Sequence, residues 1–461
     1  MAERGQEVEQ GHTDGAADSG APIVTTVAVV GAGMSGLVAA RRLRRQGIAV
    51  LVLESAERPG GRLLAETSTL GSRLDLGGQW VGHGHHRLEA LAAEMRTEVY
   101  PMRTPGRPVF IEGSRTIPAT SPAVLTAGAV LMAWEIRTRW AAPRTWASQT
   151  VDAWLSRVPG RRARRLLQVL LSVTSTADLD RYSMHAFAEA VRYQGGLTAM
   201  MATKGGAQEK LIAEGAGTLT ERLAVEPGAR VLTSHRVTNI RQDDDGLTLV
   251  TTSGTVRADR AIVTVPPPMS ARIAYDPPLP ASRAALERNT YMGSVYKAVA
   301  VYGRPFWRDR GKHAEFMLLD RPGGALFDTS PPDGPGHLCI LVAGSEAREL
   351  DQLSVEDRRQ ALLRPLVPHL GPEVLAPAGW HEKSWHLDEH VGGGYAALAG
   401  PGSTDGYFPM PSEPIGAIHW AGTETAHEHA GYIEGAIESG ERAAREVIGS
   451  LTRNEDRADE G

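Results

Sequence analysis

The 461-residue sequence predicts an α/β fold with a Rossmann-like, doubly wound sheet. Three observations near its N-terminal end predict this fold. An apolar run rich in β-branched residues, TTVAVV, begins at Thr25 and is typical of a buried parallel strand. The pattern GAGMSG follows at once, and LVAARRLRRQG then has the pattern of a helix that stops at Gly47. A second apolar run, IAVLVLE, ends in Glu54 and predicts the next strand.

The spacing of three glycines predicts a dinucleotide site. Gly31 permits a tight turn, Gly33 lets the backbone approach a pyrophosphate, and Gly36 lets the helix pack closely on the strand. The helix N-terminus offers free N–H groups and the positive end of its dipole to the phosphates. Glu54 lies 18 residues after Gly36, where a carboxylate accepts hydrogen bonds from ribose hydroxyls. The alternative is a glycine-rich turn without a ligand, but the flanking strands, the helix and the acid favour the dinucleotide.

Two further glycine turns indicate which dinucleotide is bound. The stretch SAERPGGR carries Gly61 and Arg62, and DLGGQWVG carries Gly78, Gln79 and Trp80. Both turns follow the first strand–helix–strand unit closely, which indicates a backbone pressed against a cofactor larger than NAD. An NAD dehydrogenase needs no such second segment.

Composition and charge exclude several classes of protein. The net charge of −5 differs from that of nucleic-acid-binding proteins, which usually carry a basic excess. The single cysteine, Cys339, forms no intrachain disulfide, as expected in a reducing cytoplasm. The longest apolar-leaning run, Ala123 to Trp134, is too short to cross a bilayer. Residues 1–23 and 451–461 are polar and predict disordered tails.

Several stretches together resemble the flavin monoamine oxidase family, which includes polyamine oxidases and L-amino-acid oxidases. They occur in family order over about residues 24–450: GAGMSGLVAARRL, ERPGGR, LGGQWVG, GGAQEK, YMGSVYKAVAVY, WHLDEHVGGGY and WAGTETAHEHAGYIEGAIESGERAARE. The resemblance implies a two-domain, glutathione-reductase-like fold built from noncontiguous segments. One domain binds FAD on the doubly wound sheet, and an α+β substrate domain forms a cavity over the flavin.

The domain limits follow these motifs. We expect the FAD domain to take residues 24–88, 213–290 and 392–450, and the substrate domain to take residues 89–212 and 291–391. The substrate domain includes a helical stretch from Val151 to Leu171. The basic residues within it predict a solvated helix face: Arg161, Arg162, Arg164 and Arg165.

The resemblance also implies the residues that hold FAD. They are Gly31, Gly33, Ser35, Gly36, Glu54, Gly61, Arg62, Gly78, Gln79, Trp80, Val237, Trp385, Gly422, Glu424 and Ile433. Covalent members carry a cysteine just before the first of two active-site tyrosines, but Gly394 stands there, so we expect noncovalent FAD. Trp385 matches a tryptophan beside the isoalloxazine, and its alternative is simple core filling.

The C-terminal motif predicts a strand, a turn and a long helix. Ile418 to Ala421 has the pattern of a short strand, and apolar and small residues recur at spacings of three and four after Gly431. The resemblance places the start of this helix at the flavin pyrimidine ring. Backbone N–H groups near Ile433 would then stabilise the negative charge that develops there on reduction. The alternative is an ordinary packed helix.

Lys297 is the first candidate for the chemistry. It lies in the strand SVYKAVAVY, and the residues on the same face are Val295, Val299 and Val301. A lysine among them is unusual, and the alternative is an edge-strand residue or a side chain that reaches solvent. The resemblance implies that Lys297 holds a water near flavin N5 and assists reoxidation by oxygen.

Two tyrosines complete the predicted catalytic set. Tyr395 and Tyr432 match the aromatic pair that flanks the amine in monoamine oxidases, although either alone would be typical of a core or turn. Gln208 lies in GGAQEK, which resembles a segment that lines the substrate cavity. His429 replaces a tryptophan common near the second tyrosine, and His85 stands where a glutamine is frequent.

The histidines do not predict a metal site. Their spacing matches no zinc motif, and the family needs no metal. We interpret four of them as polar cavity or surface residues that could titrate near neutral pH: His386, His390, His427 and His429.

The sequence therefore predicts an FAD-dependent amine oxidase with a small amine and O2 as partners, no nucleic acid or membrane, and a homodimer as a possible assembly. It would oxidise an amine to an imine that hydrolyses to an aldehyde or ketone, and release hydrogen peroxide. One alternative is an L-amino-acid oxidase, in which Arg192 or Arg115 would bind the carboxylate. Others are a tailoring oxidase or desaturase and, from a different class, a noncatalytic binding protein on a flavin scaffold.

Overall fold

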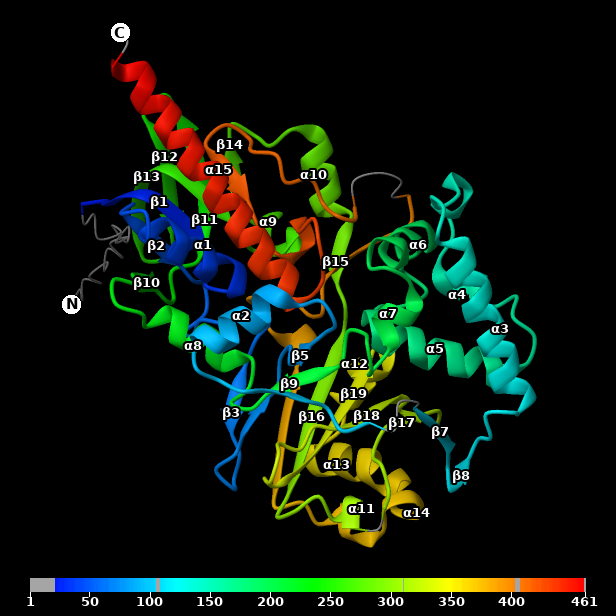
Figure 1. Ribbon diagram of the computed structural model, residues 1–461. Helices are drawn as coiled ribbons and strands as arrows, with labels where there is room; N and C mark the ends of the chain where they lie inside the picture. Colours follow the sequence, from blue (N-terminus) through cyan, green and yellow to red (C-terminus); the bar gives the residue numbers. More distant parts are fainter. Residues whose placement is uncertain (1–20, 105–107, 310, 403–406, 460–461) are drawn as a thin grey trace, which may run out of the picture.

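Two large sheets and a group of helices make up the fold (Figure 1). The computed structural model describes residues 21–104, 108–309, 311–402 and 407–459. Most of the predicted N-terminal tail, residues 1–20, lies outside the described residues, and a strand already begins at Ile23. The predicted α/β class with two bodies is confirmed.

The first sheet carries the predicted nucleotide-binding unit. Parallel pairing joins β1 to β2 on one side and to β13 on the other, and β13 also pairs in parallel with β22. An antiparallel meander of β13, β12 and β11 extends the sheet. Its strands are β1 (Ile23–Val30), β2 (Val50–Leu53), β10 (Val231–Leu232), β11 (Val237–Asp243), β12 (Gly246–Thr251), β13 (Gly254–Val263), β14 (Ala274–Asp276) and β22 (Ile418–Trp420). The predicted strands at TTVAVV, IAVLVLE and Ile418 are thus present.

Helix α1 (Met34–Arg44) follows β1 and packs against α15 (Ile433–Asp459). Two glycines permit the close approach of backbones here. A Cβ at Gly36 would lie 2.0 Å from the Gly31 carbonyl oxygen, and one at Gly440 would lie 2.3 Å from the Ser35 carbonyl oxygen. The packing role predicted for Gly36 therefore has a direct steric cause.

The second sheet positions the predicted catalytic lysine. Its order is β20-β16-β19-β18-β17-β7-β8, and all its pairs are antiparallel except β17 with β7. The strands are β7 (Val109–Glu112), β8 (Arg115–Thr116), β16 (Val295–Tyr302), β17 (Phe316–Leu318), β18 (Gly324–Asp328), β19 (Gly336–Ala343) and β20 (Gly379–Ser384). Because β16 lies between β19 and β20, Lys297 is not on an edge strand.

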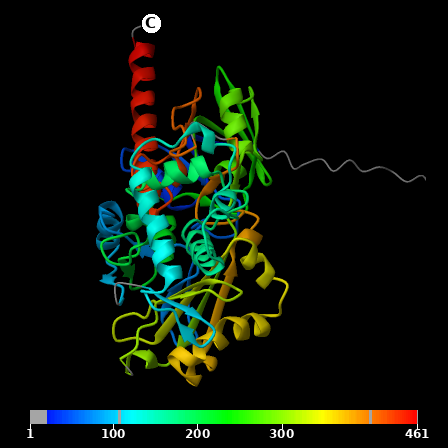
Figure 2. The same ribbon diagram turned by 90° about the vertical axis from the view of Figure 1, so that its right-hand side faces the viewer.

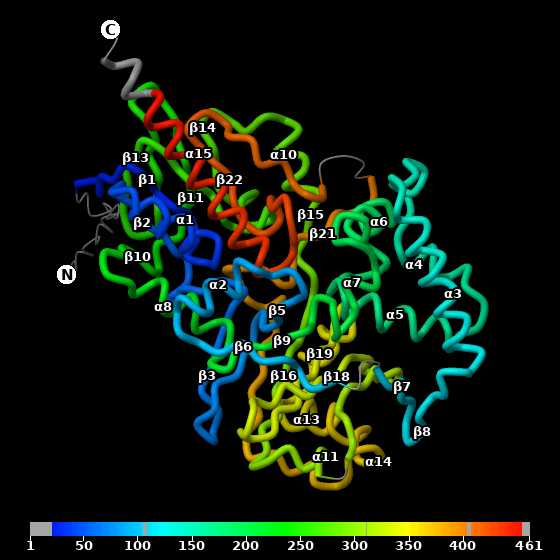
Figure 3. The backbone as a smooth tube through the Cα atoms, in the orientation of Figure 1, coloured from blue at the N-terminus to red at the C-terminus, as the bar shows by residue number. Residues whose placement is uncertain are grey.

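A group of helices lies beside the second sheet on the right of Figure 1. They are α3 (Pro122–Arg137), α4 (Val151–Leu155), α5 (Arg161–Ser175), α6 (Met184–Tyr193) and α7 (Leu197–Met201). The stretch predicted as helical from Val151 to Leu171 is divided, since Pro159 and Gly160 separate α4 from α5 and Gly160 has φ +84°. Figure 3 shows these helices as one continuous stretch of the chain, which the chain enters and leaves once.

The remaining short elements connect or cover these bodies. The helices are α2 (His86–Glu94), α8 (Gly217–Ala224), α9 (Pro267–Ser270), α10 (Ala281–Arg288), α11 (Phe306–Asp309), α12 (Ser345–Leu350), α13 (Val355–Leu363) and α14 (Val367–Leu370). The strands are β3 (Ala65–Thr67), β4 (Arg73–Asp75), β5 (Trp80–Val81), β6 (Val99–Pro101), β9 (Lys210–Ile212), β15 (Thr290–Met292) and β21 (Ala397–Ala399).

The structure corrects the interpretation of the basic run on α5 as a wholly solvated face. Arg161 and Arg162 are exposed, but Arg165 pairs with Glu346 and its Nε donates to the Leu319 carbonyl oxygen at 2.9 Å. Its side chain is 21% exposed. Arg165 therefore ties α5 to the second sheet and to α12.

The C-terminal segment is also different from the expectation. Helix α15 continues to Asp459, through most of the segment predicted as a disordered tail, and Figure 2 shows it extending beyond the rest of the molecule. Residues 451–459 contain neither proline nor glycine, so nothing in the backbone ends the helix there.

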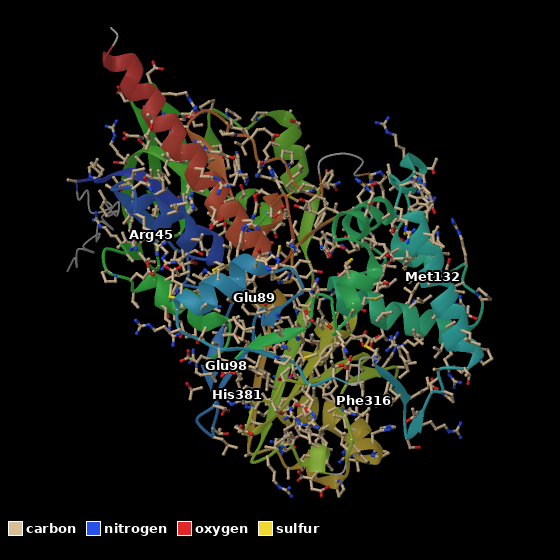
Figure 4. The ribbon with its side chains drawn as sticks, viewed as in Figure 1. Arg45, Glu89, Glu98, Met132, Phe316 and His381 are labelled. Carbon is tan, nitrogen blue, oxygen red and sulfur yellow. The ribbon has the colours of Figure 1, made fainter. Side chains whose placement is uncertain are left out.

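Helix α3 presents an apolar outer face, on which Met132 is 61% exposed (Figure 4). Neither this helix nor any other in the described part of the chain is both long and apolar enough to cross a membrane.

The close approach at Gly36 generates a first prediction. Gly36→Ala should lower the stability of the protein by about 1–3 kcal/mol, because the new methyl group overpacks the contact between α1 and the Gly31 turn. The measurement is the thermal unfolding temperature. Gly128→Ala is the matched control, since no atom lies within 4 Å of a Cβ on this α3 glycine and the exchange favours a helix. Equal behaviour of the two variants would contradict the steric argument.

Candidate active site

One extended cavity contains most of the predicted site. Seventeen of the residues expected to bind cofactor or substrate line it: Gly31, Gly33, Ser35, Glu54, Gly61, Arg62, Gly78, Gln79, Trp80, Gln208, Val237, Lys297, Trp385, Tyr395, Gly422, Tyr432 and Ile433. Three do not: Gly36, Glu424 and His429. The lining comes from both sheets and from α5 and α7, so the cavity lies between the two bodies of the fold.

Glu54 is fixed at the nucleotide-binding end of the cavity. Its side chain is buried at the end of β2, and one carboxylate oxygen accepts a hydrogen bond of 2.7 Å from the Ala32 N–H. The other accepts from the Ala56 N–H at 2.9 Å. A carboxylate has about four acceptor positions, so Glu54 keeps capacity for a ligand in the cavity.

Ser35 links the first turn of α1 to the C-terminal motif. Its hydroxyl accepts from the Gly422 N–H at 3.0 Å and lies 3.1 Å from the Ser439 hydroxyl on α15. The first glycine turn and the C-terminal segment therefore meet where α1 packs against α15.

A buried ion pair joins the second glycine turn to the same segment. Arg62 donates to both carboxylate oxygens of Glu424, at 2.6 and 3.1 Å, and to the Tyr395 carbonyl oxygen at 2.8 Å. Glu424 is 3% exposed and also accepts from the Ala397 N–H at 3.1 Å. Burial would raise the pKa of Glu424, but the Arg62 charge and these hydrogen bonds hold that pKa below its usual value.

Lys297 is almost completely buried, with 3% of its surface exposed. Its Nζ donates to the Gly77 carbonyl oxygen at 2.8 Å and to Gln79 Oε1. Burial lowers the pKa of Lys297, and the neighbouring Cys339 and Asp75 oppose that shift. An ammonium has three donors, so one N–H remains for a water or ligand in the cavity.

Different neighbours hold the backbones of the two tyrosines. The Tyr395 N–H donates to Thr176 Oγ1 at 2.9 Å, and the Tyr432 carbonyl oxygen accepts from Thr423 Oγ1 at 2.7 Å. Burial raises the pKa of both phenols, so both stay protonated at neutral pH.

The four histidines lie apart and have separate partners. His386 Nε2 lies 2.5 Å from Asp351, His427 Nε2 lies 3.3 Å from the Ser412 hydroxyl, and His390 Nδ1 lies 3.1 Å from the Ser55 hydroxyl. His390 lines the cavity near the nucleotide-binding end. The described residues contain no group of three or more side chains that could hold a metal.

His429, predicted in the substrate pocket, instead packs behind the cavity wall. Its ring centroid lies 4.9 Å from that of His85, which in turn lies 5.4 Å from the Tyr432 ring. Burial lowers the pKa of His85 to about 3, so His85 is neutral at physiological pH.

Sequence reasoning missed the apolar part of the cavity lining. This missed part includes Val173 on α5, Met200 on α7, Ala207, Val295 on β16 and Leu341 on β19, together with the polar Thr174 on α5. Leu341 is the direct cross-strand partner of Lys297. No motif identifies these residues, because their position depends on how the helices pack over the sheet.

A family model for flavin-containing amine oxidoreductases matches residues 34–448. The chain belongs to this family. It is 35% identical over 448 residues to a Mycobacterium tuberculosis protein provisionally named flavin-containing monoamine oxidase AofH, covering 93% of this chain and 98% of the relative. It is 32% identical over 460 residues to an L-amino acid dehydrogenase of Synechocystis, covering 92% and 94%. The solved structure of cyclohexylamine oxidase from Brevibacterium oxydans superposes with a TM-score of 0.87 at 29% identity, covering 93% and 99%.

This flavin-containing amine oxidoreductase is an FAD-dependent enzyme that oxidises amines. The cavity fits FAD. The glycine turns expose backbone along its wall, and Glu54 offers a carboxylate at its nucleotide-binding end. A Cβ at Gly78 would lie 3.0 Å from a Leu63 methyl carbon and 3.7 Å from Ile433 Cδ1. The single cysteine, Cys339, is buried and does not belong to the lining, so FAD is held noncovalently.

The Arg62–Glu424 pair generates a second prediction. Arg62→Met should destabilise the holoenzyme by about 3–5 kcal/mol, because it leaves the Glu424 carboxylate buried without its counter-charge. The measurement is denaturant unfolding with FAD in excess. Arg45→Met is the control, because its pair with Glu94 is exposed and such pairs contribute about 0–1 kcal/mol. A similar loss of unfolding free energy in both variants would show that the buried pair contributes no more than an exposed one.

Proposed function

We propose that the enzyme oxidises small apolar monoamines. The observation that carries this proposal is that Lys297, Tyr395 and Tyr432 share one cavity with the apolar wall from α5, α7 and β19. Two ring faces and an apolar wall suit a small amine with an apolar substituent.

The charged groups of the lining support the same substrate class. Among the described lining residues, the acids are Glu54 and Glu389. Glu54 is bonded to the glycine turn of the nucleotide site, and Glu389 pairs with Arg236 at 3.0 Å. The remaining acceptor capacity of Glu54 lies at the nucleotide-binding end, where FAD would use it, and the Glu389 carboxylate is paired with Arg236, so neither is placed to hold the distal ammonium of a diamine. Arg62 is occupied by Glu424.

The residues of the chain bind and orient the amine. The amine must lose its proton before its α-carbon gives up a hydride, and removal from water into the cavity favours the neutral form. Tyr395 and Tyr432 stay protonated and offer ring faces, so neither acts as a base. FAD, when bound in this cavity, would supply the acceptor for that hydride, and transfer of the two electrons to O2 would give an imine and hydrogen peroxide overall. The imine hydrolyses in water to an aldehyde or ketone.

We further propose that Lys297 assists the oxygen reaction. Its remaining N–H can hold a water in the cavity, and a buried ammonium favours the formation of negative charge on oxygen. The acceptor needs a test, since one relative is named a dehydrogenase.

Lys297→Met should slow reoxidation by O2 about 10- to 100-fold while FAD stays bound, since the variant loses the buried charge but keeps the length of the side chain. The measurement is stopped-flow reoxidation of the reduced enzyme, with peroxide release as a second readout. Lys312→Met, at an exposed lysine, is the control. An unchanged rate of reoxidation in Lys297→Met would remove this role.

The two arginines expected to bind a carboxylate do not support the L-amino-acid oxidase alternative. Arg192 is exposed and pairs with Glu189, Arg115 is exposed on β8, and neither lines the cavity. The name of the Synechocystis relative keeps this alternative worth testing. A tailoring oxidase or desaturase would use the same cavity, whereas a noncatalytic scaffold would turn over no amine.

Substrate selection generates a further prediction. Phenethylamine should exceed L-phenylalanine in kcat/KM by about 100-fold or more, because the added carboxylate would be buried without a partner. Peroxide release, and reduction of an artificial dye in case O2 is a poor acceptor, measure both substrates. A preference for the amino acid would favour the alternative.

We propose a cytoplasmic enzyme, as the single cysteine is typical of a reducing compartment, and a bacterial source, as the composition is rich in Ala, Arg and Gly. We also propose that the enzyme forms a homodimer. The proposed FAD segments, 24–88, 213–290 and 392–450, are supported by the first sheet, whose strands all fall within them except for Ile23. The second sheet falls in the proposed substrate segments, 89–212 and 291–391.

A further inference from the structure

The loop that carries Tyr432 is held by two consecutive residues at the end of α6. The Tyr193 hydroxyl donates to the Ala426 carbonyl oxygen at 2.9 Å. Gln194 Nε2 donates to the Ala430 carbonyl oxygen at 3.0 Å, and Gln194 Oε1 accepts from the Tyr432 hydroxyl at 3.1 Å. Helix α6 belongs to the substrate domain, so this contact crosses between the two bodies of the fold.

The chemistry of these partners fixes the direction of the last hydrogen bond. A backbone carbonyl only accepts, so the amide nitrogen of Gln194 must face Ala430. The amide oxygen then faces Tyr432, and an amide oxygen only accepts. The hydroxyl proton of Tyr432 is therefore committed to Gln194, which does not belong to the cavity lining.

We propose that Gln194 is a positioning residue that sets the orientation of the Tyr432 ring and keeps its hydroxyl proton away from the substrate. Tyr432 then acts through its ring face and not as a proton donor. This inference rests on the proposed function in one respect, which is that Tyr432 contacts the amine.

The backbone and the side chain of Tyr432 are held independently. Thr423 Oγ1 donates to the Tyr432 carbonyl oxygen at 2.7 Å and accepts from the Gly431 N–H at 2.8 Å. Both bonds lie within the C-terminal motif and remain when Gln194 is changed. Loss of Gln194 should therefore free the ring about its side-chain torsions while the backbone stays in place.

The main test is single-turnover reduction of the enzyme-bound flavin by benzylamine without oxygen. Gln194→Leu should lower the limiting rate of reduction about 3- to 10-fold, which corresponds to the loss of one hydrogen bond. Tyr193→Phe is the matched control, because it removes a bond to the same loop without touching Tyr432. Its rate should stay within about 2-fold of the wild type.

A double-mutant cycle separates positioning from general damage. In a Tyr432→Phe background, Gln194→Leu should change the reduction rate by less than about 2-fold, because the hydroxyl bond is already absent. The thermal unfolding temperature of the holoenzyme gives a second readout of the same cycle. For Gln194→Leu and Tyr432→Phe, the decrease in unfolding temperature of the double variant should differ from the sum of the two single decreases by about 1–2 °C. For Tyr193→Phe and Tyr432→Phe, the two decreases should add.

The outcomes distinguish this inference from the proposed function. Additive effects of Gln194→Leu and Tyr432→Phe in both readouts would overturn the role of Gln194, even if benzylamine reduces the wild type. An equal loss of rate in Tyr193→Phe would also overturn it. If the wild type is reduced by no amine, the proposed function fails, and additivity in the unfolding temperatures still decides whether the two side chains are coupled.

Discussion

The contact between Arg62 and Glu424 is the interaction on which the site depends. It joins a turn near residue 60, a turn near residue 424 and the segment at residues 395–397, which leads into β21. These three segments are far apart in the sequence, yet each lines the cavity or adjoins it. Because the pair is buried, its two hydrogen bonds and not the solvent set its geometry. The pair thereby fixes the position of the turn at Arg62 relative to the segment at Tyr395.

Four other charged groups of the cavity lining also have partners within the protein. Arg236 pairs with Glu389, Glu54 accepts backbone N–H groups, and Lys297 donates to Gly77 and Gln79. A buried charge without partners is costly, and these four groups have partners in the protein before any ligand enters. The part of the lining from α5, α7 and β19 is largely apolar, so on the proposed function the tyrosine rings are the main source of attraction for an amine.

The predictable part of the molecule is the part encoded by local pattern. The Gly31 turn, the strand of Lys297 and the start of α15 follow from glycine spacing, alternation of faces and helical periodicity. The helical continuation to Asp459, the buried role of Arg165 and the separation of the four histidines depend on tertiary packing or on the absence of a stop signal. Gln194 has no motif at all, because its importance comes only from the loop that packs against it.

Residues at the ends of α5 and α6 hold the two tyrosines. Thr176 follows the last residue of α5 and bonds the backbone at Tyr395, and Gln194 follows the last residue of α6 and bonds the Tyr432 side chain. Val173 and Thr174 of the same α5 end also line the cavity. A sequence change that shifts these helix ends to admit another amine would therefore move the tyrosines as well. On the proposed function, substrate choice and ring orientation should therefore change together when α5 and α6 are altered.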